Sequence, residues 1–279
     1  MRWNWIAALV LALACVGALG GCSSSSDDPN DQSVLAPVVR AMMPPKPGEA
    51  ARWAWYSYDA DNRREGITLL AGAPFGGEEV YLRLYRKRLE IDPDATVRAA
   101  CTRALGLWGH VDDVPNLLRF TIHDDSSLVR WELAQALQKI HNPVAIPALI
   151  NMVVTDKDAD VRMAAADALG QYAQPAVFST LVGALDDTEW GVVQSAHDAL
   201  TCLTGQDLGY ESRPWLAFQL ENPGKLFEHQ RQYVWYPFVK PRGFWDKVKV
   251  WSRPKDVPPR VPTGMQAAAT QPAEAPPKS

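Results

Sequence analysis

The 279-residue sequence has no excess of basic residues: 28 lysines and arginines face 32 aspartates and glutamates, and the formal net charge is −4. Proteins that bind nucleic acid present basic surfaces to the phosphates. The mildly acidic balance therefore excludes nucleic acid as the expected partner. The other composition values, 47% hydrophobic and 22% charged residues, are typical of a globular chain.

Motifs for catalysis are also absent from the sequence. It contains neither a G-x-S-x-G elbow nor a phosphate-binding P-loop. A metal site needs several converging ligands, but the five histidines occupy different helical settings and His123-Asp124-Asp125 is interpreted as an exposed turn. We therefore predict no catalytic, cofactor-binding or metal-binding residues, and a protein that is not an enzyme.

No apolar run is long enough to cross a bilayer, which takes roughly 20 residues. The longest one, Ile6 to Leu19, follows the basic Arg2 and precedes Leu19-Gly20-Gly21-Cys22. This arrangement is typical of a signal peptide rather than of a transmembrane anchor, which is the alternative. The tetrapeptide resembles the lipobox of bacterial lipoproteins. The resemblance implies cleavage after Gly21, a signal peptide over residues 1–21 and a lipid on Cys22, and Ser23 in place of aspartate favours the outer membrane over the inner one.

One sequence pattern recurs at a fixed spacing of 32 residues. Val97-Arg98, Val129-Arg130, Val161-Arg162 and Val193-Gln194 each follow an acidic turn and precede a run of small apolar residues. A fixed period of this size is the signature of a stacked solenoid. The sequence thus predicts an all-α fold, an α-solenoid of about five helix pairs.

Two helices are expected in each unit. Pro115, Pro147 and Pro175 mark the starts of first helices, where a missing N–H costs nothing. The second helices are expected at about residues 96–107, 127–140, 159–172 and 190–203, and the residues expected to cap their N-terminal ends are Asp94, Ser126, Asp158 and Thr188. Cys101 and Cys202 lie three periods apart, too far for a disulfide.

The acidic turn, the Val-Arg pair and the Leu-Gly ending resemble HEAT repeats of the short PBS-lyase-like variety, over roughly residues 59–204. By this resemblance, the arginine after valine joins a ladder with acidic turn residues of adjacent repeats. The positions that match are Arg98, Arg130, Arg162, Asp92, Asp124 and Asp156. Gln194 replaces the arginine in the last repeat, so we expect the ladder to stop there.

The helix face opposite the apolar one is the expected partner-binding surface. Val161, Ala164 and Ala168 share a buried face by their spacing. The opposite face carries six candidate partner-binding residues in two successive repeats: Trp131, Gln135, Lys139, Met163, Asp167 and Gln171.

The remaining segments are divided as follows. Residues 22–50 form a disordered tether, 51–215 the solenoid, 216–252 an irregular aromatic cap and 253–279 a disordered Pro/Ala-rich tail. Aromatic residues at both ends, such as Trp53 and Trp235, either cap the solenoid or form a binding patch, and the turn at residues 204–210 is either a capping loop or a ligand loop. Trp245 and Trp251 belong to the C-terminal aromatic group.

Together these observations predict a lipid-anchored cell-envelope protein that serves as a scaffold for protein interaction. The expected partners are an unidentified envelope protein and the membrane, through the lipid on Cys22. Two alternatives stay open. The C-terminal aromatics could bind a carbohydrate such as a cell-wall polymer. The solenoid groove could also carry a lyase-like activity, which the resemblance to PBS-lyase-like repeats implies. A di-iron hydroxylase with related repeats uses His-Glu dipeptides, which are absent here.

Overall fold

The computed structural model describes residues 46–237 and 258–265. All of them belong to one compact unit, Lys46–Ser279. The predicted signal peptide, the lipidation site Cys22 and nearly all of the predicted tether lie outside the described residues, as do Trp245 and Trp251.

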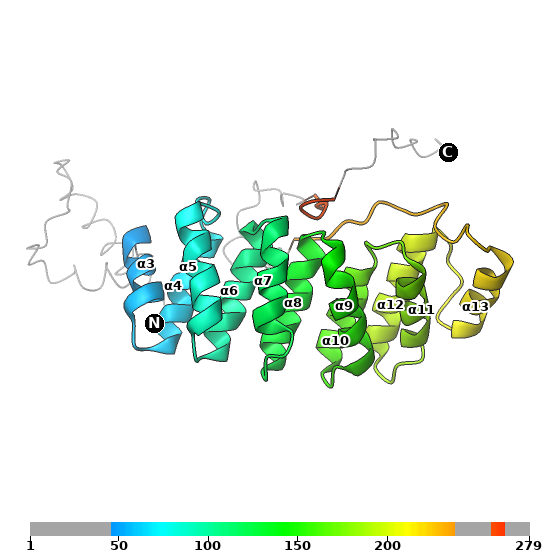
Figure 1. The fold of residues 1–279 in the computed structure, drawn as a ribbon, viewed down its shortest axis with the longest axis horizontal. Helices are drawn as coiled ribbons and strands as arrows, with labels where there is room; N and C mark the ends of the chain where they lie inside the picture. Colours follow the sequence, from blue (N-terminus) through cyan, green and yellow to red (C-terminus); the bar gives the residue numbers. More distant parts are fainter. Residues whose placement is uncertain (1–45, 238–257, 266–279) are drawn as a thin grey trace, which may run out of the picture. The chain divides into compact units, whose positions relative to one another are not determined.

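Eleven α-helices and two short 3-10 helices follow one another in the described part of the chain, and it contains no β-strand beyond two isolated bridges. The fold is all-α, as predicted (Figure 1). The elements are α3 (Pro47–Tyr56), α4 (Ala60–Gly72), α5 (Glu79–Ile91), α6 (Ala95–Trp108), η1 (Val111–Asp113), α7 (Val114–Thr121), α8 (Ser127–Lys139), η2 (Pro143–Ala145), α9 (Ile146–Thr155), α10 (Ala159–Leu169), α11 (Pro175–Ala184), α12 (Trp190–Thr204) and α13 (Ser212–Glu221).

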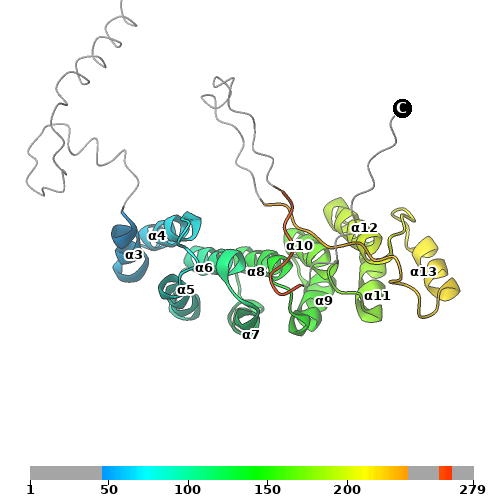
Figure 2. The same ribbon diagram turned by 90° about the horizontal axis from the view of Figure 1, so that it is seen from above.

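The helices form two layers. The second helices of the pairs, α4, α6, α8, α10 and α12, pack side by side, and α5, α7, α9 and α11 lie on one side of them (Figure 2). Small residues allow the second helices to approach closely. A Cβ atom on Gly106 of α6, for example, would lie only 2.8 Å from the Cα and Cβ atoms of Ala136 in α8. This packing produces the predicted α-solenoid.

Several helix starts follow the sequence signals. The Asp94 side chain accepts hydrogen bonds from the N–H groups of Thr96 and Val97, and Asp158 accepts one from Asp160. Proline stands in the first turn of α7, α9 and α11. Ser126 precedes α8 without a side-chain cap, and Glu189, rather than the expected Thr188, precedes α12.

The N-terminal end differs from the expectation. α3 begins at Pro47, inside the predicted tether, and its buried residues are Ala50 and Ala54. A Cβ atom on Gly66 of α4 would lie 2.5 Å from the Ala50 carbonyl oxygen, so the two helices touch backbone to backbone. Small residues therefore form the packing contact at the N-terminal end. Tyr56 and Tyr58 do not contribute a buried cap, because they are 74% and 103% exposed.

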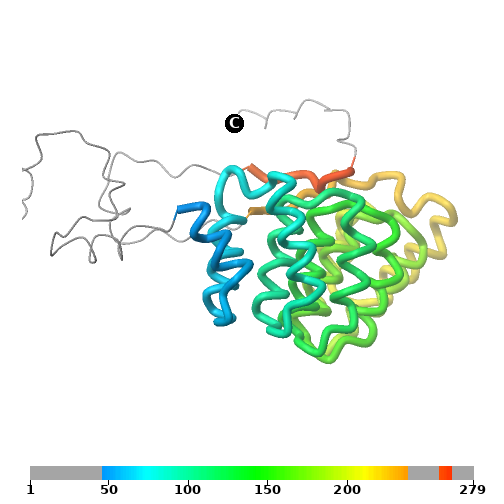
Figure 3. Tube along the Cα trace, turned by 60° about the vertical axis from the view of Figure 1, so that its left-hand side comes forward, coloured from blue at the N-terminus to red at the C-terminus, as the bar shows by residue number. Residues whose placement is uncertain are grey.

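The C-terminal segment also differs from the expectation. Residues 231–236 and 258–265, here named the C-terminal strap, lie on the solenoid (Figure 3). The predicted disordered tail 253–279 is thus wrong for residues 258–265. The N–H groups of Arg231 and Thr263 donate to the carbonyl oxygens of Cys202 and Lys139, each at 2.8 Å. The last carbonyls of a helix have no partner inside the helix, and the strap supplies the missing donors for α12 and α8.

Candidate functional site

A ladder of arginine–aspartate pairs runs along the turns of successive repeats. Each arginine reaches forward to the acidic turn of the next repeat through two nearly parallel hydrogen bonds. The rungs are Arg63–Asp92, Arg98–Asp124, Arg130–Asp156 and Arg162–Asp187, with Nε–Oδ2 distances of 2.7 to 2.8 Å. Such bidentate pairs fix geometry as well as charge.

Every rung also makes hydrogen bonds to the backbone of the turns that hold its arginine and its aspartate. Arg130 Nη1 donates to the carbonyl oxygen of Asp124 at 2.8 Å, and Asp156 Oδ1 accepts from the N–H of Asp158 at 3.0 Å. A single pair thus connects the turns of two repeats and shapes the start of the next second helix. The role of the ladder is structural, because these side chains are largely buried and all their polar atoms point to the protein.

Electrostatics keep the ladder ionised. Burial acts to raise the pKa of Asp124 and Asp156, but hydrogen bonds from Arg98 and Arg130 and from backbone N–H groups outweigh it, so both pKa values are lowered. For Asp187, the hydrogen bond from Arg162 is the leading cause of a lowered pKa. These three carboxylates therefore stay charged at neutral pH.

The sequence-based set named three of the four arginines and missed Asp187 as the last acceptor. Arg63 lay in an acidic stretch resembling the other turns, which is the signal that could have identified it. Asp187 pairs with an arginine 25 positions earlier, whereas Asp124 and Asp156 pair across 26 positions. Gln194 is exposed and forms no ladder bond within the described residues.

The six candidate partner-binding residues are less accessible than expected. Gln171 is buried, at 3% exposure, and the other five are half-buried: Trp131, Gln135, Lys139, Met163 and Asp167. The Gln171 amide donates to the carbonyl oxygens of Leu137 and Ala168. Gln171 is therefore part of the contact between α8 and α10 and not of an open surface.

The C-terminal strap covers part of this face. The Tyr233 hydroxyl donates to Asp167 Oδ1 at 3.1 Å, and Lys139 Nζ lies 5.5 Å from the centre of the Trp235 ring. Burial raises the pKa of Asp167, although the hydrogen bonds from Tyr233 and Gln138 act in the opposite direction. Tyr233 and Trp235 are only 5% and 8% exposed. These two aromatics act as a cap, one of the two roles that the sequence left open.

The repeats that the strap contacts and the C-terminal part of the chain carry opposite net charges. Residues 122–221 contain 14 acidic and 5 basic residues, a net charge of −9, whereas residues 222–279 contain 4 acidic and 10 basic residues, a net charge of +6. Opposite net charges attract one another, which favours association of a basic segment with acidic repeats. Because the strap is not part of the 32-residue pattern, the repeats themselves gave no sign of where it would bind.

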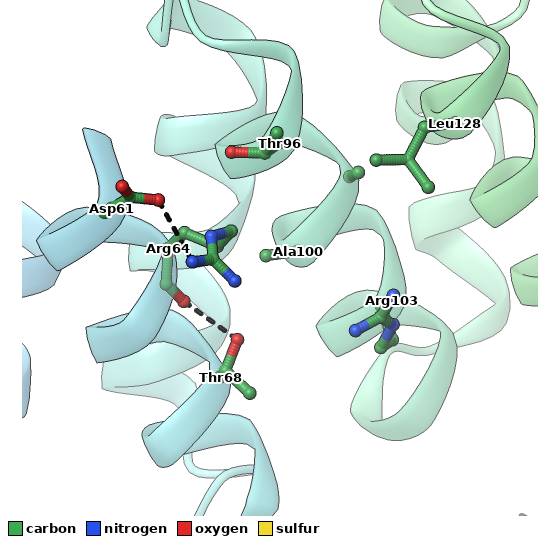
Figure 4. A pocket seen from close by; sticks show the side chains of 8 residues that line it. Asp61, Arg64, Thr68, Thr96, Ala100, Arg103 and Leu128 are labelled. Carbon is green, nitrogen blue, oxygen red and sulfur yellow. Dashed lines mark hydrogen bonds and ion pairs between the residues drawn. The ribbon is translucent and has the colours of Figure 1, made fainter.

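The described strap residues do not cover the N-terminal part of the second-helix layer. A pocket of about 290 Å³ lies between α4, α6 and α8 (Figure 4). Ala99 and Ala100 form its floor, Arg64 and Arg103 lie on either side, and Leu128, 40% exposed, lies at its edge. Arg64 pairs with Asp61 at 3.0 Å, and Arg103 pairs with the buried Glu132.

A second exposed group lies at the other end of the layer. The Trp190 and Tyr210 rings lie 4.9 Å apart, and Tyr210 covers His197 at 4.3 Å. His197 Nε2 lies 2.9 Å from Asp207 Oδ1, and this hydrogen bond lowers the pKa of Asp207. Trp215 is fully buried and donates its Nε1–H to the Gly209 carbonyl oxygen, so the loop at residues 204–210 packs over α12.

Neither a metal nor a membrane site emerges from the described ranges. Residues 46–237 and 258–265 contain no group of three or more His, Cys, Asp or Glu side chains arranged to hold a metal ion. None of the helices in these ranges combines the length and apolar character that a membrane span requires.

Comparison with known proteins gives one matching family model and a partly similar solved structure. Residues 82–166 and 122–201 match the family model described as HEAT repeats. Residues 82–201 are therefore similar in sequence to HEAT repeats, and their helix pairs stack as an α-solenoid. Among solved structures, the X-ray structure of the Escherichia coli protein YibA is 22% identical, with a TM-score of 0.49, and the match covers 70% of this chain and 73% of that chain. No curated protein sequence matches the chain significantly.

Proposed function

We propose that this protein is a lipid-anchored protein of the bacterial cell envelope whose HEAT-repeat solenoid is a scaffold for protein interaction. Stacked repeats present extended surfaces that suit the binding of other proteins. The lipid anchor rests on the resemblance of Leu19 to Cys22 to a lipobox. The proposed partner is another envelope protein, and the proposed location is the outer membrane.

The observation that carries this proposal is the open pocket of Figure 4. The strap contacts the C-terminal ends of α8, α10 and α12, whereas the pocket lies toward α4 and α6. Binding energy at protein interfaces is concentrated where a few side chains fill a pocket on the partner. A pocket with a small apolar floor, whose two flanking guanidinium groups already pair with Asp61 and Glu132, suits a small apolar partner side chain.

Affinity capture from detergent-solubilised envelopes would test the scaffold. The informative variant is Arg64→Ala with Leu128→Ala, because both side chains are largely exposed and their removal leaves the core intact. The matched control is Asn151→Ala with Val154→Ala on α9, two exposed positions of the other layer. We expect one protein to be recovered with the wild type and the control and lost with the pocket variant. Equal recovery with all three would contradict the proposed surface.

The anchor needs a separate test. Cys22→Ser should abolish incorporation of radiolabelled fatty acid and move the protein from the membrane to the soluble fraction of fractionated cells. Ser23→Ala, a neighbouring change that keeps the cysteine, should leave both properties as in the wild type. Fatty-acid incorporation that persists in Cys22→Ser would refute the anchor without affecting the scaffold.

The carbohydrate-binding alternative has lost part of its basis. Tyr233 and Trp235 are buried on the solenoid and unavailable to a polymer. That alternative would rest on Trp245 and Trp251, which lie outside the described residues.

A further inference from the structure

A second cleft lies in the other layer, between α5 and α7. Its volume is about 360 Å³, near the lower end of the range of roughly 300–1,000 Å³ for small-molecule sites. Leu105 of α6 and Leu89 of α5 form its apolar base, and Phe120 of α7 adds an aromatic side chain. The cleft is therefore lined by apolar side chains where it is deepest.

Cations dominate the rest of the lining. Arg83, Arg86 and Lys87 come from α5 and Arg119 from α7, against the single acidic residue Glu90. Arg86 is occupied, since its Nε lies 2.6 Å from Asp113 Oδ1 and its Nη1 2.8 Å from Glu79. Lys87 Nζ lies 3.0 Å from Glu90 Oε2.

Two guanidinium groups in the cleft differ from the others. Within the described part of the chain, Arg83 and Arg119 form no ion pair, and the interaction found for Arg119 is with the Phe120 ring, 5.2 Å from its Cζ. In contrast, each of the four ladder arginines has a carboxylate partner. Arg83 and Arg119 thus combine exposed positive charge with an adjoining apolar surface.

We propose that this cleft binds a small anionic amphiphile, a molecule with one phosphate or carboxylate head and a short apolar part. Guanidinium groups bind such heads through paired N–H donors, and the Asn116 amide, which also lines the cleft, can add a donor. Leu89, Leu105 and Phe120 would contact the apolar part. This site lies in a different layer from the pocket of Figure 4 and does not depend on the proposed scaffold function.

Calorimetric titration of the full chain, held in phosphatidylcholine nanodiscs, with hexyl phosphate would test the site. Inorganic phosphate and hexanol serve as probes for the head and the tail alone. We expect hexyl phosphate to bind more tightly than either. The variant Arg83→Gln with Arg119→Gln should weaken its binding by about tenfold per arginine. The control Arg213→Gln removes an exposed charge on α13 and should leave the affinity unchanged.

The outcomes separate clearly. Unchanged affinity in the double variant, an equal loss in Arg213→Gln, or equal binding of hexanol and hexyl phosphate would each overturn the proposal. So would binding of an acidic peptide without binding of hexyl phosphate. A thermal melt with the wild-type midpoint would show that the double variant is folded. A further titration with part of the lipid replaced by phosphatidylglycerol identifies the source, because a membrane lipid would compete with the probe and a soluble ligand would leave its affinity unchanged.

Discussion

The ladder rung Arg130–Asp156 can be tested against an exposed pair of the same chemistry. The Arg130 and Asp156 side chains are 16% and 7% exposed, whereas those of Arg64 and Asp61 are 47% and 81% exposed. Arg130→Met and Arg64→Met keep most of the aliphatic stem and remove the guanidinium. The two substitutions therefore differ mainly in burial and in the bonds lost.

The magnitude follows from those bonds. Arg130→Met removes two hydrogen bonds to Asp156 and two to the carbonyl oxygens of Asp124 and Asp125. Breaking a buried ion pair costs about 3–5 kcal/mol. Some solvent reaches Arg130, and Asp156 keeps its bond from the Asp158 N–H, so we expect a loss of about 2–4 kcal/mol. An exposed pair contributes about 0–1 kcal/mol, which is the loss expected for Arg64→Met.

Urea denaturation followed by circular dichroism would measure both variants beside the wild type. A third variant, Lys157→Met, removes an exposed lysine on the turn that contains Asp156 and controls for charge alone. The reasoning would be refuted if Arg130→Met unfolded within about 0.5 kcal/mol of Arg64→Met. It would also be refuted if Lys157→Met cost as much as Arg130→Met.

Three further predictions use the same protein. First, the pKa values of Asp124, Asp156 and Asp187 are lowered in the folded protein, so these carboxylates contribute stability that is fully present above the unfolded pKa of about 3.9 and is lost as the pH falls through their folded pKa values. The urea concentration at the unfolding midpoint should therefore decrease once the pH is below about 4. An equal midpoint concentration at pH 3 and pH 7 would contradict this prediction. Second, Gly205 has φ +73°, and a Cβ atom there would lie 2.4 Å from the His229 carbonyl oxygen. Gly205→Ala should therefore loosen the strap and increase the rate of tryptic cleavage after Arg231. The control Gly183→Ala, at a position with open space around it, should leave that rate unchanged. Third, burial raises the pKa of the Cys101 thiol and raises that of Cys202 to about 11, so maleimide labelling at pH 8 should modify Cys202 slowly and Cys101 only on unfolding; rapid modification of Cys101 in the folded protein would show that it is not buried.

Several features of the fold could be predicted from the sequence alone. Val97, Val129 and Val161 recur at one spacing and are all fully buried, because each repeat packs the same face on its neighbour. Asp94 and the prolines at the helix starts also predicted correctly where α6, α7, α9 and α11 begin. The ladder arginines were identified only through the family resemblance, and the predicted set held three of the four acceptor aspartates and lacked Asp187.

The candidate site was less predictable. Helical spacing assigned Lys139 and Asp167 to the face opposite the core, but it carried no information on what covers that face. Tyr233 reaches Asp167 from 66 positions away. A contact at this separation depends on the path of a segment that lacks the repeat, and no local pattern encodes that path.

The sequence by itself determined the repeated helix pairs, though not α3 or α13, because burial of one face and the capping of helix ends are decided by residues within one or two turns. Only the tertiary structure decided which surfaces stay open. The N–H groups of Arg231 and Thr263 donate to carbonyl oxygens at the ends of α12 and α8, and these bonds join segments that are far apart in the sequence. Among the described residues, the strap contacts the ends of α8, α10 and α12 and does not reach the pocket between α4, α6 and α8.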